Sequence, residues 1–318
     1  MLAPRAVRPA TPLLRSFSSL SVAYHCPSIR DITVESAEQF LRRQKEFREN
    51  LARLRKEQQE SEDRHHEAVS KRGHLSSLIY GTVKGQKFDK ELARSSSQVL
   101  ERGKYVHSIV MHDVKPNKVD EYVDLVGQWY PRMANIEDNR VNLVGSWRTQ
   151  VGDNDTFIHI WEYQRYEGYH SSLHKISEQP GFREFDNKLK SLIKSKKTSL
   201  MQEFSFWHTT PPRRLGGLFE LRTYTLYPGN LLEWESHWCR SLSSRREVME
   251  GVGAWFVQIG DLNTVHQLWQ FANLEHRRIC REKSWGHDGW AETVYKTAHL
   301  TQTMQSRILI PMPWSPVG

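Results

Sequence analysis

The pattern of hydrophobic and polar residues occurs twice along the C-terminal two thirds of the chain. Residues 144–161 read VGSWRTQVGDNDTFIHIW and residues 252–269 read VGAWFVQIGDLNTVHQLW, and they match at eight of eighteen positions at a constant offset of 108. Self-similarity of this kind indicates two copies of one structural unit. We therefore interpret the chain as a tandem repeat.

Both copies contain the same order of predicted elements. A strand-like run leads to a proline, Pro116 or Pro228, which opens a helix with apolar residues at helical spacing. Two short strands around a Gly-Asp turn, a second helix and a last strand follow. In the first copy we expect a strand over 105–114, a helix over 119–133, a hairpin turn at 152–155, a helix over 165–193 and a strand over 199–207. In the second copy we expect a strand over 218–227, a helix over 231–242, a hairpin turn at 260–263, a helix over 273–298 and a strand over 304–310.

The order β-α-β-β-α-β is the ferredoxin-like motif. Two such sheets packed face to face would close a barrel with the helices outside. The predicted fold class is therefore α+β, with two tandem ferredoxin-like (βαββαβ) units that form an intrachain dimeric α/β-barrel behind an N-terminal helical segment. We divide the chain into a targeting segment (1–25), a charged helical lead-in and connector (26–103), a first domain (104–210) and a second domain (211–318).

The lead-in contains a polar helix. Residues 36–72 have no proline or glycine, and apolar residues at 3/4 spacing mark one face, which Gln44 interrupts. This face is too short for a sustained coiled coil. We favour a solvated helix that docks on its own protein, and a helix that binds a partner protein is the alternative. Residues 73–103 are interpreted as an irregular connector.

Composition narrows the function classes. The net charge is +8, but the first thirty residues hold four arginines and no acid, so the remainder carries only +4. The positive and negative charges of residues 31–318 are thus nearly equal in number, which does not favour nucleic acid as a partner. No apolar run approaches the length of a membrane helix. Three cysteines without a CxxC spacing indicate neither a disulfide framework nor a zinc site.

The first 25 residues are basic, serine-rich and free of acids, and prolines interrupt any secretory apolar core. This composition is typical of a mitochondrial transit peptide, and the matrix is the expected compartment. A disordered basic tail is the alternative.

The second copy resembles the NIPSNAP family in the runs FELRTYTLYPG (219–229), QIGDLN (258–263), VHQLW (265–269) and SRILIP (306–311). The first copy is similar to the family's degenerate partner domain, through VGSW (144–147) and EFSFW (203–207). The resemblance covers residues 105–318. It implies a dimeric α/β-barrel-type fold, a mitochondrial location, and a role as an adaptor that recruits autophagy machinery or acts in vesicular transport. It does not imply a defined catalytic activity.

One strand carries candidate ligand-binding chemistry. Alternation in the strand at 218–226 places Glu220, Arg222 and Tyr224 on one face. These groups could orient a small ligand inside the barrel, but we favour a structural Glu–Arg ion pair. His159 shares a strand face with Trp161, and we interpret it as a core or interface group rather than a metal or haem ligand. The full candidate set is His159, Trp161, Glu220, Arg222, Tyr224, Trp255 and Trp269.

Two function classes therefore stay open. The favoured class is a non-enzymatic mitochondrial adaptor or scaffold in quality control or vesicular transport, with other proteins as partners. The alternative is a barrel that binds a small ligand or haem and supports oxidoreductase-type chemistry, which rests on analogy between folds. Signatures of nucleotide loops, serine hydrolases and zinc proteases are absent from the sequence. We expect no metal, and the sequence leaves homo-oligomerisation undetermined.

Overall fold

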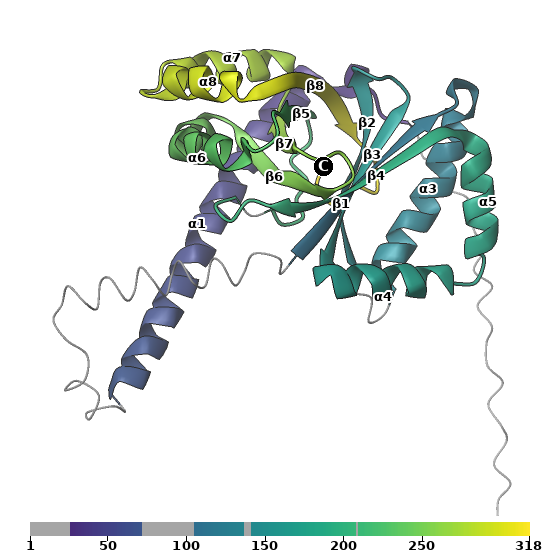
Figure 1. Ribbon diagram of the computed structural model, residues 1–318, viewed down its shortest axis with the longest axis horizontal. Helices are drawn as coiled ribbons and strands as arrows, with labels where there is room; N and C mark the ends of the chain where they lie inside the picture. The colour runs from purple at the N-terminus through teal and green to yellow at the C-terminus, as the bar shows by residue number, and fades with distance from the viewer. Residues whose placement is uncertain (1–25, 72–104, 137–140, 208) are drawn as a thin grey trace, which may run out of the picture.

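The computed structural model describes residues 26–71, 105–136, 141–207 and 209–318 (Figure 1). The predicted transit peptide and the predicted connector at 73–103 lie outside the described residues. Within the described part of the chain, every helix is too short or too polar to span a bilayer. The predictions of a targeting segment and of a connector therefore stay predictions.

The N-terminal part is a short 3-10 helix, η1 (Ile29–Asp31), and a long helix, α1 (Val34–Lys71). Ser28 caps η1 and Asp31 bonds back to the Ser28 backbone, so the segment before α1 has a defined conformation. Helix α1 crosses one side of the barrel and then extends away from it (Figure 1). Its first half docks on the protein, as the favoured interpretation expects: Phe40 is fully buried.

The first domain follows the predicted order with one more helix than expected. Its elements are β1 (Tyr105–Val114), η2 (Pro116–Lys118), α3 (Val119–Ala134), β2 (Val141–Val151), β3 (Thr156–Gln164), α4 (Arg165–Ser177), α5 (Phe182–Leu192) and β4 (Ile193–Glu203).

The second domain has the same arrangement. Its elements are β5 (Leu218–Leu226), α6 (Leu231–Val248), β6 (Glu250–Ile259), β7 (Thr264–Phe271), α7 (Leu274–Trp285), α8 (Trp290–His299) and β8 (Thr301–Pro311).

The prediction of one continuous helix in the second half of each copy is wrong. In the first domain Pro180 and Gly181 separate α4 from α5, because proline lacks the N–H that a helix interior needs. Gly181 and Gly289 begin the following helices with φ of +82° and +79°, a backbone conformation that glycine adopts without strain. The last strands also begin earlier than predicted, at Ile193 and Thr301, because pairing with neighbouring strands extends them through polar residues.

The eight strands form one closed barrel in the order β1-β3-β2-β8-β5-β7-β6-β4, in which β4 pairs with β1. Antiparallel pairs β2–β8 and β4–β6 join the two domains. Closure leaves the sheet without free edges. The helices lie outside, with α3, α4 and α5 at one side and α6, α7 and α8 at the other (Figure 1). The predicted intrachain barrel is confirmed.

A cluster of apolar side chains packs inside the barrel, and every strand contributes at least one. In both copies the repeated Gly-x-Trp places an indole back over its own strand. A Cβ on Gly145 would lie 2.3 Å from the ring of Trp147, and a Cβ on Gly253 would lie 2.4 Å from the ring of Trp255. Glycine is therefore required beneath each tryptophan. The interior residues are Ile109, Val144, Trp147, Ile158, Ile160, Met201, Phe219, Leu221, Val252, Trp255, Val257, Leu268, Leu309 and Val317.

Candidate functional site

The polar face of β5 points away from the barrel. Phe219 and Leu221 fill the interior, so the alternation turns Glu220, Arg222 and Tyr224 toward the layer between the sheet and helices α6–α8. The sequence predicted correctly that these three side chains share a face. These three side chains do not line the barrel interior, because Phe219 and Leu221 of the same strand point there.

Glu220 is the centre of an ionic network in this layer. Its side chain is only 1% exposed, and Arg222 Nη1 donates to Oε1 at 2.9 Å. Arg277 of α7 donates to both oxygens, at 2.7 and 2.9 Å, and Ser306 Oγ donates to Oε1 at 2.7 Å. Burial alone would raise the pKa of Glu220, but the Arg277 hydrogen bonds and the Arg222 charge lower it to about 2. The favoured Glu–Arg pair is thus present.

A cavity lies beside this network, between β5, β7 and β8 and helices α6, α7 and α8. Its volume is about 110 Å³. Three arginines line it, together with a phenol, an amide and several indoles and aliphatic groups. We call it the arginine cavity, and its lining residues are Arg222, Tyr224, Trp234, Trp238, Arg245, Gln267, Arg281, Trp285, Trp290, Val294, Thr297, Ala298, Thr301 and Met304.

Arg245 is the most unusual member of this set. It is 5% exposed, and its guanidinium carbon lies 4.4 Å from the ring centre of Trp290 and 5.5 Å from that of Trp269. Among the residues that the structure describes, its Nε has no hydrogen-bond partner, and neither does Nη1 of the half-buried Arg281. Burial lowers the pKa of Arg245 to about 10, and the charges of Arg222 and Arg281 act in the same direction. Stacking on indoles offsets only part of this penalty.

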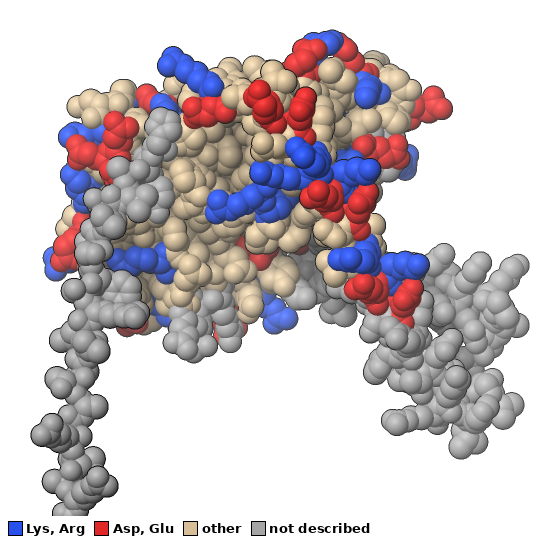
Figure 2. All heavy atoms as spheres, turned by 180° about the vertical axis from the view of Figure 1, so that it is seen from behind, with Lys and Arg blue, Asp and Glu red and all other residues tan. Residues whose placement is uncertain are grey.

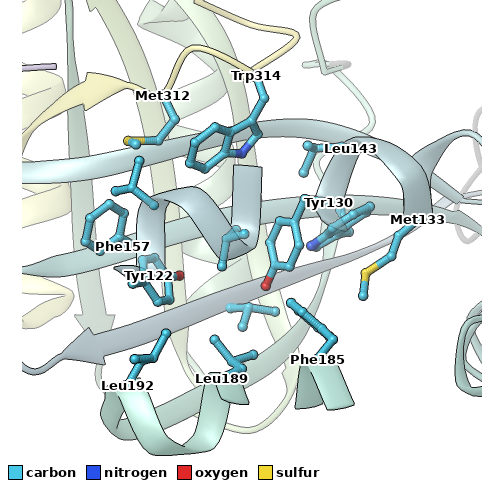
Figure 3. Packing of buried hydrophobic residues seen from close by; sticks show 14 of the residues in the cluster. Tyr122, Tyr130, Met133, Leu143, Phe157, Phe185, Leu189, Leu192, Met312 and Trp314 are labelled. Carbon is cyan, nitrogen blue, oxygen red and sulfur yellow. The ribbon is translucent and has the colours of Figure 1, made fainter. Parts of the chain in front are cut away.

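The corresponding layer of the first domain is packed with apolar and aromatic side chains (Figure 3). At the offset that aligns Pro116 with Pro228, Val110 stands in place of Arg222 and Met133 in place of Arg245. Both residues belong to the buried cluster between the first-domain sheet and its helices. The two domains therefore share a backbone and differ in what fills this layer.

A hydrogen-bonded chain of neutral groups crosses the first-domain layer. His159 Nδ1 lies 2.8 Å from Ser146 Oγ, and His159 Nε2 lies 2.9 Å from Tyr122 Oη. Tyr122 Oη lies 2.7 Å from Nδ1 of His112. Burial lowers the pKa of His112 to about 3 and holds that of His159 well below its ordinary value. His159 is thus a satisfied core histidine, as interpreted from the sequence.

With this geometry in place, comparison with known proteins gives the family. The NIPSNAP family model matches residues 108–207 and 219–316. The chain belongs to the NIPSNAP family. It is 35% identical over 249 residues to "Protein NipSnap homolog 1" of Danio rerio, covering 78% of this chain and 88% of that protein. It is 36% identical over 213 residues to "Protein NipSnap homolog 2" of Homo sapiens, covering 67% and 74%.

Solved structures with the same fold include a putative monooxygenase from Lactobacillus acidophilus, with a TM-score of 0.51 and 11% identity. The match covers 65% of this NIPSNAP chain and 94% of the monooxygenase chain. A putative monooxygenase from Fusobacterium nucleatum gives a TM-score of 0.52 and 10% identity, covering 66% and 93%. At these identities the likeness concerns the fold alone.

The structure places the seven candidate residues of this NIPSNAP chain in three locations. Glu220, Arg222, Tyr224 and Trp269 lie in the second-domain layer. His159 and Trp161 lie in the first-domain layer, and Trp255 lies inside the barrel. The candidates therefore do not form one site.

Sequence reasoning missed Arg245 and Arg281. A signal was present: Trp234, Trp238 and Leu242 form an apolar stripe on α6, and the next position at helical spacing is Arg245. An arginine at the end of a buried stripe, where the first copy has Met133, indicates a buried charge.

Haem does not fit the arginine cavity of this NIPSNAP chain. No histidine lines the arginine cavity, which at about 110 Å³ is well below the roughly 300 Å³ at which pockets for drug-sized ligands begin. Both ring nitrogens of His159 already have partners. For metals, the residues that the structure describes contain no cluster of three or more His, Cys, Asp or Glu side chains that would hold an ion.

Proposed function

We propose that this NIPSNAP protein is a mitochondrial adaptor or scaffold, which uses its N-terminal helix to contact partner proteins in quality control or vesicular transport. The supporting observation is that the first half of α1 is docked on the core while its following turns extend away from the barrel (Figure 1). A helix held at one end by the core presents its remaining surface in a constant orientation. The adaptor role itself follows the family resemblance.

The base of α1 is held first by apolar contact. Phe40 packs against Leu215, in the segment between the domains, and against Ala272 at the end of β7, and all three are buried. Ala37 and Phe47 extend this contact along the helix. Residues at 3/4 spacing thus form the docked face that the sequence pattern indicated.

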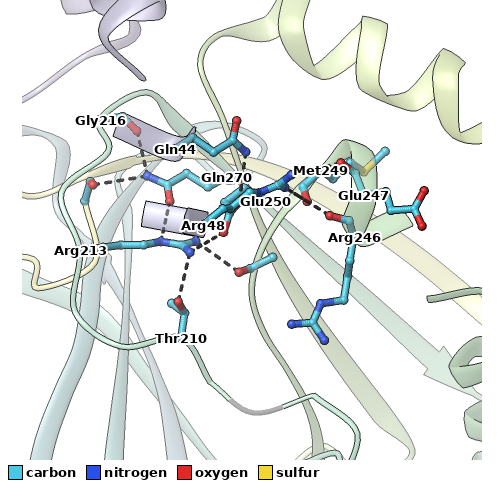
Figure 4. A network of polar contacts seen from close by, with 12 residues as sticks. Gln44, Arg48, Thr210, Arg213, Gly216, Arg246, Glu247, Met249, Glu250 and Gln270 are labelled. Atoms are coloured by element: carbon cyan, nitrogen blue, oxygen red, sulfur yellow. Dashed lines mark hydrogen bonds and ion pairs between the residues drawn. The ribbon is translucent and has the colours of Figure 1, made fainter. Parts of the chain in front are cut away.

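A buried polar network completes the attachment (Figure 4). Arg48 Nε and Gln44 Nε2 both donate to Glu250 Oε2, at 2.8 and 3.1 Å. Arg213 donates to the other oxygen of Glu250 at 2.6 Å, and its side chain is 2% exposed. Gln44, which interrupts the apolar face in the sequence, is therefore part of the docked face.

Arg48 also caps helix α6. The last carbonyls of a helix lack intrahelical partners and carry partial negative charge. The guanidinium of Arg48 satisfies three carbonyls at this end, those of Arg246, Glu247 and Met249. The attachment of α1 and the end of α6 are therefore one structural unit.

Beyond the attachment, α1 presents mixed charge. Arg53 and Glu57 form an exposed i,i+4 pair, as do Lys56 and Glu60, and Leu54 is half exposed between them. Figure 2, which views the molecule from behind, shows lysines and arginines beside acids over that face. Mixed charge suits a protein partner better than a polyanion.

Charge reversal on α1 tests the adaptor proposal. Arg53→Glu with Lys56→Glu is expected to remove a defined set of neighbours from proximity labelling in mitochondria. The matched control is Lys296→Glu on α8, which also reverses an exposed ion-paired lysine and is expected to retain that set. Circular dichroism verifies that α1 stays helical. An unchanged set of neighbours in the α1 variant would contradict the proposal.

The mitochondrial location is part of the proposal and rests on the composition of residues 1–25. Replacing Arg5, Arg8 and Arg15 by glutamate is expected to abolish import, because matrix targeting depends on a basic, acid-free segment. An in vitro import assay with protease protection provides the measurement. Import that persists in this variant would refute a transit peptide at this position.

A further inference from the structure

We propose that the arginine cavity of the second domain binds a small organic carboxylate, with the carboxylate between Arg245 and Arg281 and a short apolar remainder against the tryptophans. This goes beyond the adaptor role, which does not require the cavity. Four observations support it.

The first observation is a charge imbalance. Four arginines surround the layer: Arg222, Arg245, Arg277 and Arg281. The carboxylate whose charge acts on Arg245 and on Arg281 is that of Glu220. Glu220 is already bound by Arg222, Arg277 and Ser306. Arg245 and Arg281 therefore interact with Glu220 only at a distance and form no ion pair of their own among the described residues, and a buried charge without a direct partner is unfavourable.

The second observation is a buried donor without an acceptor, on a residue that lines the cavity. Arg245 is more than nine-tenths buried and lines the cavity, and its Nε has no acceptor. Arg281 lines the same cavity from α7, and its Nη1 also lacks an acceptor. Buried donors are nearly always paired, so an acceptor is missing at this place.

The third observation is the first domain, which has the same backbone and no such charge. Met133 occupies the position of Arg245 and packs in the buried cluster there. The fold therefore accommodates an apolar side chain at this position. Structural need does not explain the arginine, whereas ligand binding does.

The fourth observation is the shape and lining of the cavity, which define the ligand class. A planar carboxylate matches the fork of a guanidinium. Indoles of Trp234, Trp238, Trp285 and Trp290 form much of the remaining wall, and such a wall favours an apolar group. A volume of about 110 Å³ equals that of roughly three to four molecules of liquid water, so the remainder must be short.

Thermal unfolding of the full chain tests the proposal, with sodium butyrate as the probe. Butyramide is the neutral isostere, inorganic phosphate the alternative anion, and sodium chloride keeps the ionic strength constant. We expect butyrate to raise Tm in a concentration-dependent manner, since a ligand that binds the native state alone stabilises it. Butyramide and phosphate are expected to give no comparable shift.

The decisive variant is Arg245→Met, which places the first-domain residue at this position. We expect its affinity for butyrate to fall at least tenfold, while its Tm without ligand equals or exceeds that of the wild type, because a buried unpaired charge is removed. Arg281→Leu is expected to weaken binding in the same direction. Arg278→Met is the matched control: Arg278 is exposed on α7, pairs with Glu275 and Glu282, and does not line the cavity.

Three outcomes would overturn the proposal. A butyrate shift that survives in Arg245→Met would place the carboxylate elsewhere. A shift of equal size with butyramide would show that charge is not recognised. Phosphate binding without butyrate binding would make this an inorganic-anion site. If Arg245→Met lowers Tm without ligand, affinities are measured at a temperature where the variant is folded, and retained affinity would still refute the assignment.

Discussion

The two domains share one backbone arrangement but differ in the layer between sheet and helices. In the first domain this layer is aromatic and neutral, and its buried histidine His159 has partners on both ring nitrogens. In the second domain arginines stand where the first has apolar residues, as in Arg222 against Val110 and Arg245 against Met133. The comparison shows that the fold does not determine the chemistry of this layer.

The difference between the two layers also distinguishes residues that stabilise the fold from residues that we propose to bind a ligand. A filled layer buries apolar area at about 25 cal/mol per Å², whereas a buried unpaired guanidinium lowers stability. The first domain therefore provides the reference for what the fold needs. Arg245, where the first domain has Met133, is the feature for which we propose a ligand as the explanation.

The largest effect is expected from removing the charge of Glu220. Glu220→Gln leaves Arg222 and Arg277 in a buried site without their carboxylate, which should lower the free energy of unfolding by about 3–5 kcal/mol. In the first domain Ser108 occupies the equivalent position, and its Oγ lies 3.4 Å from Tyr163 Oη. Ser108→Ala should change stability by only about 1 kcal/mol. Urea unfolding measures both values, and equal effects would refute the asymmetry.

A smaller loss of stability is expected from substitutions inside the barrel, and it should be equal for the two domains because they share this interior. Gly145→Ala and Gly253→Ala each place a Cβ within 2.5 Å of an indole, so Trp147 or Trp255 must move. Overpacking of this kind lowers stability by about 1–3 kcal/mol. The two variants should have similar midpoints in urea. A clear difference between them would show that the interior is less symmetric than the repeat indicates.

The last effect depends on pH. Burial lowers the pKa values of His112 and His159 in the folded protein, so the unfolded chain takes up protons first as pH falls below about 6.5. Stability is therefore full above that pH and decreases below it, by at most about 1.4 kcal/mol per pH unit for each histidine. Between pH 6.5 and 5 the carboxyl of Glu220, with its pKa of about 2, contributes little.

His159→Gln introduces the residue that the second domain has at the equivalent position, Gln267, and removes one titrating group. The slope of unfolding free energy against pH should become shallower in this variant. Urea unfolding at several pH values measures it. An unchanged slope would mean that His159 is not among the groups that resist protonation.

Much of the fold could be predicted from the sequence because its signals are local. The Gly-x-Trp and Gly-Asp repeats marked the strands and their hairpins, and the domain order followed from them. Alternation correctly grouped Glu220, Arg222 and Tyr224. It could not show which face lies toward the helices, because β5 is largely buried on both faces and the polar face does not point to solvent.

The parts that could not be predicted depend on contacts between distant segments. Gln44 looks like a defect in an apolar face until Glu250, 206 positions later, provides its partner. The unpaired state of Arg245 depends on where every nearby carboxylate lies, and no local pattern contains that information. The helix break at Pro180 differs, because its local signal was present and was overlooked.

The most direct test of the asymmetry between the domains is a proton–nitrogen NMR spectrum of the tryptophan indoles during titration with butyrate. We expect the cavity indoles of Trp234, Trp238, Trp285 and Trp290 to shift along a saturating curve. The indole of Trp161, in the first-domain layer, should stay in place. Shifts that are absent, or that are as large for Trp161 as for the cavity indoles, would contradict the account.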